Sequence, residues 1–140
     1  MADTVSLSTI STEAAHRVIA AAEAKATEIG VPMCIAVHDA GGNLKAFSRM
    51  DGAALLSTQV SQDKAYTAVG FGMATHDWHD FIKDDAPLAA GATTGIARLV
   101  IFGGGYPLKV DDAVVGAIGV SGGHYSQDQE VAEAGLTALG

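Results

Sequence analysis

The sequence predicts an α+β fold in which helices pack against a five-stranded antiparallel sheet. Two pairs of strand-like segments are separated by short turns, one at Gly41–Asn43 and one at Asp111–Asp112, so each pair forms a hairpin. Helical patterns flank these hairpins, and the chain reads α-β-β-α-α-β-β-β-α. Because a parallel sheet needs a long crossover where this chain has a tight turn, the sheet is expected to be antiparallel.

The first helix is predicted to run from Ser11 to Ile29. Ser11 can cap its amino end, Glu13 lies near the positive end of the helix dipole, and Gly30 stops the helix. Its apolar stripe is rich in alanine and comprises Ala15, Val18, Ile19, Ala22, Ala26 and Ile29. Small side chains of this kind allow a helix to lie close against a sheet.

The strands are predicted from period-two patterns and from the turns that bound them. The segment 31–40 directs Met33, Ile35 and Val37 to one face and Cys34, Ala36 and His38 to the other. Further strands are expected at 43–50, 98–102, 108–110 and 113–120, with the glycine-rich run 103–107 as a break after the third strand.

Three further helical segments are expected after the first hairpin. The second helix covers about 55–72, and Thr75 caps a short helical piece at 76–82. A loop that contains Pro87, Gly91 and Gly95 follows. In the last helix Ser126 is the expected cap, and Gln129 completes a capping box with it.

Composition indicates one domain, residues 1–140, and argues against several classes of partner. The formal net charge is −8, from 8 Lys+Arg against 16 Asp+Glu, and no basic cluster offers a footprint for nucleic acid. No apolar run reaches the ~18 residues that a membrane span needs. The first eleven residues lack the basic and apolar regions of a secretion signal, so a cytoplasmic location is expected. Cys34 is the only cysteine, so no intrachain disulfide can form.

A glycine-rich bend at Gly119–Gly123 raises the question of a catalytic serine. Its sequence fits G-x-S-x-G, the strand-to-helix turn that exposes a nucleophile in α/β-hydrolases. That fold needs a long parallel sheet, and the one downstream histidine, His124, is too close to Ser121 to act as an independent base. We therefore interpret Ser121 as a hydrogen-bonding turn residue. The bend leads to a helix amino terminus, where free N–H groups suit a carboxylate or phosphate on a ligand.

Three stretches together carry a family resemblance: VHDAGGNLKAFSRMDGA, QDKAYTAVGFGMAT and FGGGYPLKVDDAVVGAIGVSGGHYSQDQEVAEAG. In this order they resemble the GlcG/HbpS-like family, which includes the C-terminal domain of PduO-type cobalamin adenosyltransferases. The resemblance implies a profilin-like arrangement with helices on both faces of the sheet. It also implies a homo-oligomer, often an octamer, that binds haem or a related tetrapyrrole. Other members lie in catabolic gene clusters.

Haem needs an axial ligand, most often histidine. His124 in the glycine-rich bend is the first candidate. His16 is the second, because the resemblance to PduO-type domains implies that haem can be ligated from the first helix. The expected small-molecule site comprises Asp39, Gly119, Ser121, Gly122, Gly123 and His124. His38 can instead hydrogen-bond within its hairpin.

The segment HDWHD offers a different metal hypothesis. His76 and His79, three residues apart on a helix, can share a face and bind a transition metal such as zinc. A third protein ligand would be required, and the sequence supplies no matching motif. The alternative is an exposed polar helix end.

An enzymatic alternative uses Arg49, Asp51 and Lys64. Lys64 lies on a mostly apolar helix stripe, where partial burial would lower its pKa and suit acid–base chemistry. Arg49 can clamp a substrate carboxylate, and Asp51 can orient either cation or move a proton. This hypothesis describes a cofactor-independent lyase, isomerase or hydrolase for a small carboxylate. The same residues can equally form a structural ion network.

Overall fold

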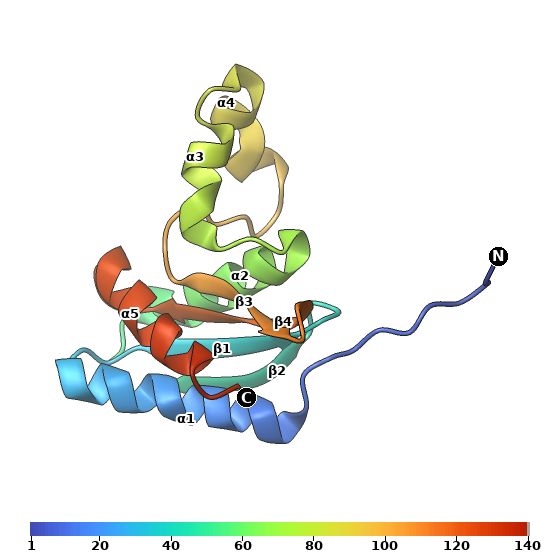
Figure 1. Ribbon diagram of the computed structural model, residues 1–140. Coiled ribbons are helices and arrows are strands. Elements are labelled where there is room, and N and C mark those ends of the chain that lie inside the picture. The colour runs from blue at the N-terminus through green and yellow to red at the C-terminus, as the bar shows by residue number, and fades with distance from the viewer. Residues whose placement is uncertain (140) are drawn as a thin grey trace.

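The computed structural model describes residues 1–139 and shows a four-stranded antiparallel sheet of order β2-β1-β4-β3 (Figure 1). The strands are β1 (Cys34–Asp39), β2 (Leu44–Arg49), β3 (Gly105–Val110) and β4 (Ala113–Ser121). The helices that cover the sheet are α1 (Thr12–Ile29), α2 (Leu55–Phe71) and α5 (Tyr125–Leu136). The remaining helices are η1 (Thr75–Asp77), α3 (Trp78–Ile82) and α4 (Ala86–Gly95).

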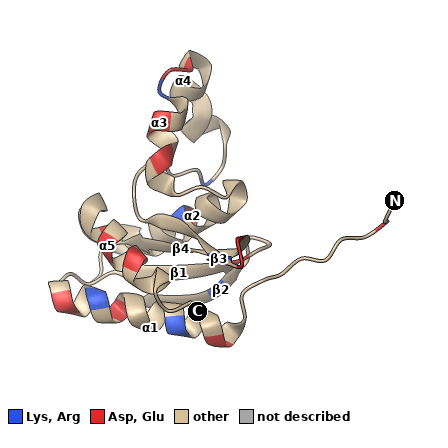
Figure 2. Ribbon diagram, viewed as in Figure 1, with Lys and Arg blue, Asp and Glu red and all other residues tan. Residues whose placement is uncertain are grey.

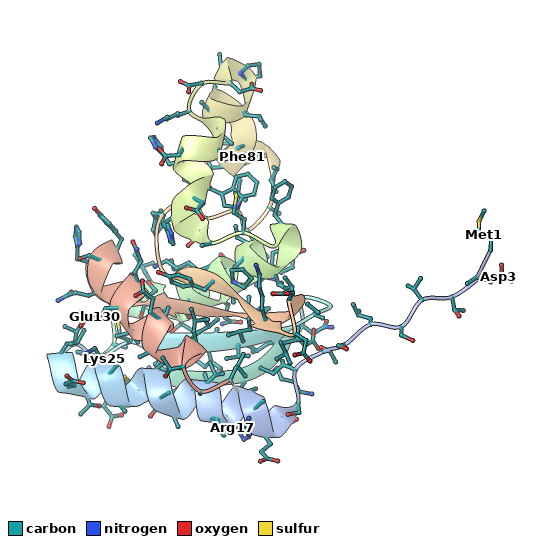
Figure 3. All side chains as sticks on the ribbon, in the orientation of Figure 1. Met1, Asp3, Arg17, Lys25, Phe81 and Glu130 are labelled. Atoms are coloured by element: carbon teal, nitrogen blue, oxygen red, sulfur yellow. The ribbon has the colours of Figure 1, made fainter. Side chains whose placement is uncertain are left out.

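Helices α1 and α5 pack side by side on one face of the sheet, and the alanine-rich stripe of α1 is buried there as predicted. The side chains of Ile35 and Val37 in β1, and of Met33 just before it, are fully buried against this layer. Lys25 of α1 lies 3.4 Å from Glu130 of α5 and ties the two helices together at the surface (Figure 3). Ser11 caps α1 by accepting a hydrogen bond from the Ala14 N–H, which confirms the predicted helix start.

Helix α2 covers the opposite face at very close range. A Cβ at Gly119 of β4 would overlap the Ser61 carbonyl oxygen of α2, so only glycine fits at this strand position. Beside it, Ala36, Ala65 and Ala117 form a layer of small buried side chains. The glycine-rich character of β4 therefore serves the contact between helix and sheet.

The prediction of a fifth strand at 98–102 was wrong. Arg98 has a positive φ of 65°, and Thr67 of α2 holds the segment through its hydroxyl group. That hydroxyl donates to the Arg98 carbonyl at 2.8 Å and accepts from the Val100 N–H at 3.0 Å. The backbone groups that a strand would need for pairing are thus bonded to a helix side chain. The run 103–107 does not break a strand, because β3 begins within it at Gly105.

The loop predicted around Pro87 is the helix α4. Asp85 caps this helix by accepting a hydrogen bond from the Leu88 N–H. Pro87 occupies the first turn, where its missing N–H has no partner to lose. Together α3 and α4 form a helical projection that rises from the sheet (Figure 1).

Both predicted hairpins are present. Asp111 and Asp112 have positive φ values of 51° and 65°, the backbone of a tight turn that matches strand twist. None of the helices within residues 1–139 is long and apolar enough to cross a bilayer. Acidic residues are spread over α1, α3, α5 and the turn between β3 and β4 (Figure 2).

Candidate functional site

The most unusual polar contact in the protein is a fully buried ion pair beneath the glycine run 103–105. Lys64 of α2 has no exposed surface, and its Nζ donates to Asp128 Oδ2 at 2.9 Å and to the Val120 carbonyl at 2.8 Å. Asp128, in the first turn of α5, is only 3% exposed. A Cβ at Gly104 would lie 2.7 Å from Lys64 Nζ, so glycine leaves the room that the ammonium group occupies.

Burial lowers the pKa of Lys64, and the negative charge of Asp128 acts in the opposite direction. The sequence prediction of a buried lysine is therefore confirmed, but its partner is Asp128 and not Asp51. The pair joins α2, β4 and α5 because Nζ contacts both the last strand and the last helix. The Phe102 ring, with its centroid 5.2 Å from Nζ, lies over the lysine.

The backbone N–H groups at the amino end of α5 are bonded to side chains of the protein itself, including the Asp128 carboxylate. The Gly123 N–H donates to Asp128 Oδ1 at 3.0 Å, and the His124 N–H donates to Gln127 Oε1 at 3.0 Å. The N–H groups expected to receive a ligand carboxylate at this bend are therefore bonded to side chains of the same helix. Asp128 and Gln127 were not identified as site residues from the sequence, because an acid and an amide in a first turn are common.

The predicted cap of α5 was displaced by two residues. His124, and not Ser126, is the N-cap, and its Nδ1 accepts from the Ser126 N–H at 3.3 Å. Gln127, and not Gln129, completes the capping box. The Nδ1 atom of His124 also lies 2.8 Å from Ser126 Oγ.

Ser121 ends β4 opposite Cys34 of β1. Its neighbour His124 is bonded to Ser126, so the histidine is not positioned as a base for Ser121. Gly122 has a φ of 149°, and a Cβ there would lie 2.7 Å from the Pro32 carbonyl oxygen. This tight bend supports the interpretation of Ser121 as a turn residue.

Next to the buried ion pair, the surface forms a hollow of about 510 Å³ that we call the histidine hollow. It is lined by His76, His79, Ile101, Phe102, Gly103, Tyr125 and Gln129. Three separate parts of the chain meet here, namely the η1–α3 segment, the run that precedes β3, and the start of α5. Phe102 and Tyr125 are each about half exposed, so aromatic rings face the open space.

The two imidazoles of the histidine hollow each have a carboxylate neighbour. His76 Nε2 lies 3.4 Å from Asp77 Oδ1, and His79 Nδ1 lies 4.0 Å from Asp80 Oδ1. Within residues 1–139, no set of three or more His, Cys, Asp or Glu side chains could hold a metal ion. A zinc site at His76 and His79 therefore lacks the third ligand that it would require.

His124 lies beside the histidine hollow but is not part of its lining. Its ring centroid is 4.2 Å from that of Tyr125, which is a wall residue. His16 is exposed on α1. Because Lys25 meets Glu130 while Val18 packs on Gly135, α1 and α5 are antiparallel. His16 and His124 thus lie at opposite ends of this helical layer.

Arg49 and Asp51 line a different hollow, together with Glu23, Ser48 and Met50. Arg49 is on β2 at one edge of the sheet, whereas Lys64 contacts β4 and the entry to β3. One intervening strand separates these positions, and strands are spaced about 4.8 Å apart. The structure therefore does not assemble Arg49, Asp51 and Lys64 into one site.

Two further residues from the predicted set have structural roles. Asp39 Oδ1 accepts from the N–H groups of Gly41 and Asn43, each at 3.0 Å, and so shapes the first hairpin. His38 is 1% exposed, and its Nδ1 has no hydrogen-bond partner among the described residues. Burial lowers the pKa of His38 to about 4, with the nearby Arg98 charge as a second cause.

A small antiparallel sheet between two helical layers, with imidazoles and aromatic rings around one surface hollow, defines an α+β domain. Residues 10–137 match the family model described as haem degrading protein HbpS-like. The chain belongs to this family, which confirms the resemblance seen in the sequence motifs.

Relatives cover nearly the full length of the chain. A 15.0 kDa protein from the dhaT-dhaS intergenic region of Citrobacter freundii is 43% identical over 93% of this chain and 92% of its own length. The crystal structure of Klebsiella pneumoniae protein ORFY is 38% identical, with a TM-score of 0.92 over 99% of this chain and 95% of that one. The PduOC:heme complex is 32% identical, with a TM-score of 0.87 over 94% of this chain and 95% of that one.

Proposed function

We propose that the protein binds haem or a related tetrapyrrole in the histidine hollow. The observation that carries this proposal is the meeting of imidazoles from the η1–α3 segment with aromatic rings from two other segments around a space of about 510 Å³. That size falls in the range of small-molecule and cofactor sites, roughly 300–1,000 Å³. The haem bound by the PduOC relative supports the same ligand class for this chain.

The residues of the hollow fit the chemistry of a haem. Phe102 and Tyr125 offer apolar ring surface to the macrocycle, and imidazole nitrogen is the commonest protein ligand to haem iron. His79 is the ligand that we favour within the hollow, because Asp80 lies on the Nδ1 side and Nε2 remains open. A carboxylate hydrogen-bonded behind a ligating imidazole orients the ring and raises its basicity, so Asp80 Oδ1, at 4.0 Å from Nδ1, would have to move closer to act in this way. Bound haem would supply a redox-active iron at the protein surface.

Two other histidines are candidate ligands. His124 stacks on Tyr125 at the rim, and its Nδ1 is engaged with Ser126, which leaves Nε2 as the ligating atom. His16 is the candidate that the family resemblance implies. His16 is exposed on α1, so its imidazole is open to a ligand from solvent.

The test is a haem titration followed at the Soret band, with His79→Ala, His124→Asn and His16→Ala in parallel. Asparagine at position 124 retains a good N-cap for α5, so loss of binding would report on the iron ligand and not on helix fraying. Saturable one-to-one binding with a Soret shift in one variant would support haem binding and name the ligand.

Two results would contradict parts of the proposal. Weak, unsaturable binding that is equal in all four proteins would overturn haem binding itself. Loss of binding in His16→Ala alone would keep the haem but move it from the histidine hollow to α1. The bis-variant His76→Ala/His79→Ala checks whether the two imidazoles of the hollow substitute for one another.

The same proposal includes a homo-oligomer in the cytoplasm with the profilin-like arrangement that the family resemblance implies. No nucleic acid or membrane partner is proposed. A catalytic role for Arg49, Asp51 and Lys64 is not part of it, because Lys64 is bonded to Asp128 and Val120 and lies apart from the other two.

A further inference from the structure

A second hollow, which we call the aromatic hollow, lies on the other side of α3 from the histidine hollow. Its volume is about 300 Å³, and its walls include Tyr66, Phe71, Trp78, Ile96, Ala97 and Leu99. Within the η1–α3 segment, Trp78 lines the aromatic hollow. His76 and His79 line the histidine hollow. In the segment before β3, Leu99 lines the aromatic hollow and Ile101 lines the histidine hollow.

The walls of the aromatic hollow are built from rings that contact one another. The Phe71 and Trp78 ring centroids are 5.1 Å apart at an interplanar angle of 52°, and Phe81 packs edge-on against Trp78 at 5.6 Å. Phe71 and Phe81 are both more than half exposed, although burial of such rings is strongly favourable. The cluster thus presents unfilled aromatic surface, with Phe81 on the helical projection (Figure 3).

The Thr67 hydroxyl and the Arg98 guanidinium at the aromatic hollow are already paired, whereas the buried Trp78 Nε1 has no hydrogen-bond partner among the described residues. The Thr67 hydroxyl is bonded to the Arg98 carbonyl and the Val100 N–H. The Arg98 guanidinium stacks over the Tyr66 ring at 4.0 Å and forms an ion pair with Asp63 at 2.8 Å. A charged ligand would find no free counter-charge in Arg98, because Asp63 already neutralises it. The free polar group of the wall is a neutral donor, Trp78 Nε1, so a neutral ligand is favoured.

One wall carries stored backbone strain. Arg98 has a φ of 65°, which is uncommon for a residue with a side chain, and Thr67 holds the segment in place. Strained positions that the surrounding structure enforces occur preferentially at ligand sites. The same segment carries Ile96, Ala97 and Leu99, which line the hollow together with residues of α2.

We propose that the aromatic hollow is a second ligand site, which takes one small, neutral aromatic molecule. Its volume is about twice the ~150 Å³ of an engineered apolar cavity that binds benzene, so a two-ring molecule the size of indole matches it. Shape and apolar contact with the rings select the ligand, and the walls offer no ionic contact. The site is separate from the histidine hollow and does not depend on haem.

Substitution of Gly70 tests whether a ligand occupies the aromatic hollow. It lines the aromatic hollow from α2, and a Cβ at this position would meet nothing within 4 Å. Gly70→Leu therefore fills the space without a clash, and Gly70→Ala is the matched control that leaves most of it open. Both substitutions replace a helical glycine, so neither is expected to weaken the fold.

The probe is indole, added to ¹⁵N-labelled protein. Trp78 is the only tryptophan, so its indole N–H gives a single assigned signal in a ¹H–¹⁵N spectrum. We expect a saturable shift of that signal in the wild type and in Gly70→Ala, and a loss of affinity of at least about tenfold in Gly70→Leu. His79→Ala should bind indole normally, which separates this site from the proposed haem site.

Two outcomes would overturn the inference. One is equal indole affinity in Gly70→Leu and Gly70→Ala, or no saturable shift at all. The other is a change of oligomeric state in Gly70→Leu, measured by light scattering, with no wild-type indole binding. That second result would assign the rings to a contact between protein copies and not to a small molecule.

Discussion

The Nζ atom of Lys64 lies 2.9 Å from Oδ2 of Asp128, and both side chains are buried. The two residues are 64 positions apart in the chain and belong to the helices on opposite faces of the sheet. Their contact passes the end of β4, where Nζ also bonds to the Val120 carbonyl. A single ammonium group thus joins both helical layers beside the histidine hollow.

Removal of one member of this pair should strongly destabilise the protein. Lys64→Met leaves the Asp128 carboxylate buried without its counter-charge, and we expect a loss of about 3–5 kcal/mol in the free energy of unfolding. The double variant Lys64→Met/Asp128→Leu removes both charges and should recover part of that loss. Urea denaturation of the three proteins measures the difference. A double variant that is no more stable than Lys64→Met would contradict this account.

His38 should make stability depend on pH in a defined window. Its pKa is about 4 in the folded protein, against 6.5 when exposed, because burial disfavours the charged ring. The unfolded chain therefore binds the extra proton first, and stability falls as pH drops from about 6.5 to 4. The 2.5-unit difference corresponds to roughly 3 kcal/mol over that window.

His38→Leu removes this titration while other groups remain. Denaturation curves at several pH values give the free energy of unfolding of both proteins. As pH drops from about 6.5 to 4, the wild type should lose stability relative to His38→Leu by the His38 contribution. A wild-type curve parallel to that of His38→Leu between pH 4 and 6.5 would show that the imidazole is not held neutral by burial.

Two glycine-to-alanine substitutions should act in opposite directions. Gly104 has a φ of 126°, and a Cβ would lie 2.6 Å from the Val120 carbonyl oxygen, so Gly104→Ala should destabilise by about 2–3 kcal/mol. Gly91 lies in α4, where a Cβ would meet nothing within 4 Å, so Gly91→Ala should stabilise by about 0.5–1 kcal/mol. Thermal melts read both changes, and a neutral Gly104→Ala would show that the glycine run is not tightly packed.

The hydroxyl of Thr67 should be needed to hold the segment before β3. Thr67→Val keeps the shape of the side chain but leaves the buried Val100 N–H without an acceptor, at an expected cost of about 1–3 kcal/mol. Thr67→Ser retains the hydroxyl and should lose much less. If both variants unfold at the same denaturant concentration, the two bonds do not stabilise this segment.

Local signals in the sequence predicted most of the regular structure. The Ser11 cap, the αL residue Gly30 and the alanine stripe identify α1, since each acts within a few residues of the chain. The turn at Asp111–Asp112 identifies its hairpin for the same reason. The alternation of Met33 and Ile35 with their neighbours assigned both faces of β1 correctly.

Features that depend on distant contacts were not predictable in this way. The segment 98–102 has the composition of a strand, and only its bonds to Thr67, about thirty positions earlier, keep it out of the sheet. Lys64 was recognisable as a buried cation, but nothing near Asp128 marked it as the partner. The histidine hollow likewise combines three segments, and only the imidazole pair on one of them was visible in the sequence.

Amide hydrogen exchange in the helical projection of α3 and α4 should report on ligand binding. Helices α3 and α4 pack mainly against each other and η1, whereas β1 and β4 lie at the centre of the sheet between both helical layers. Amide hydrogens of α3 and α4 should therefore exchange with solvent through local opening, well before those of β1 and β4. Since α3 borders both hollows, occupation of either one should slow exchange in that helix and leave the central strands unchanged.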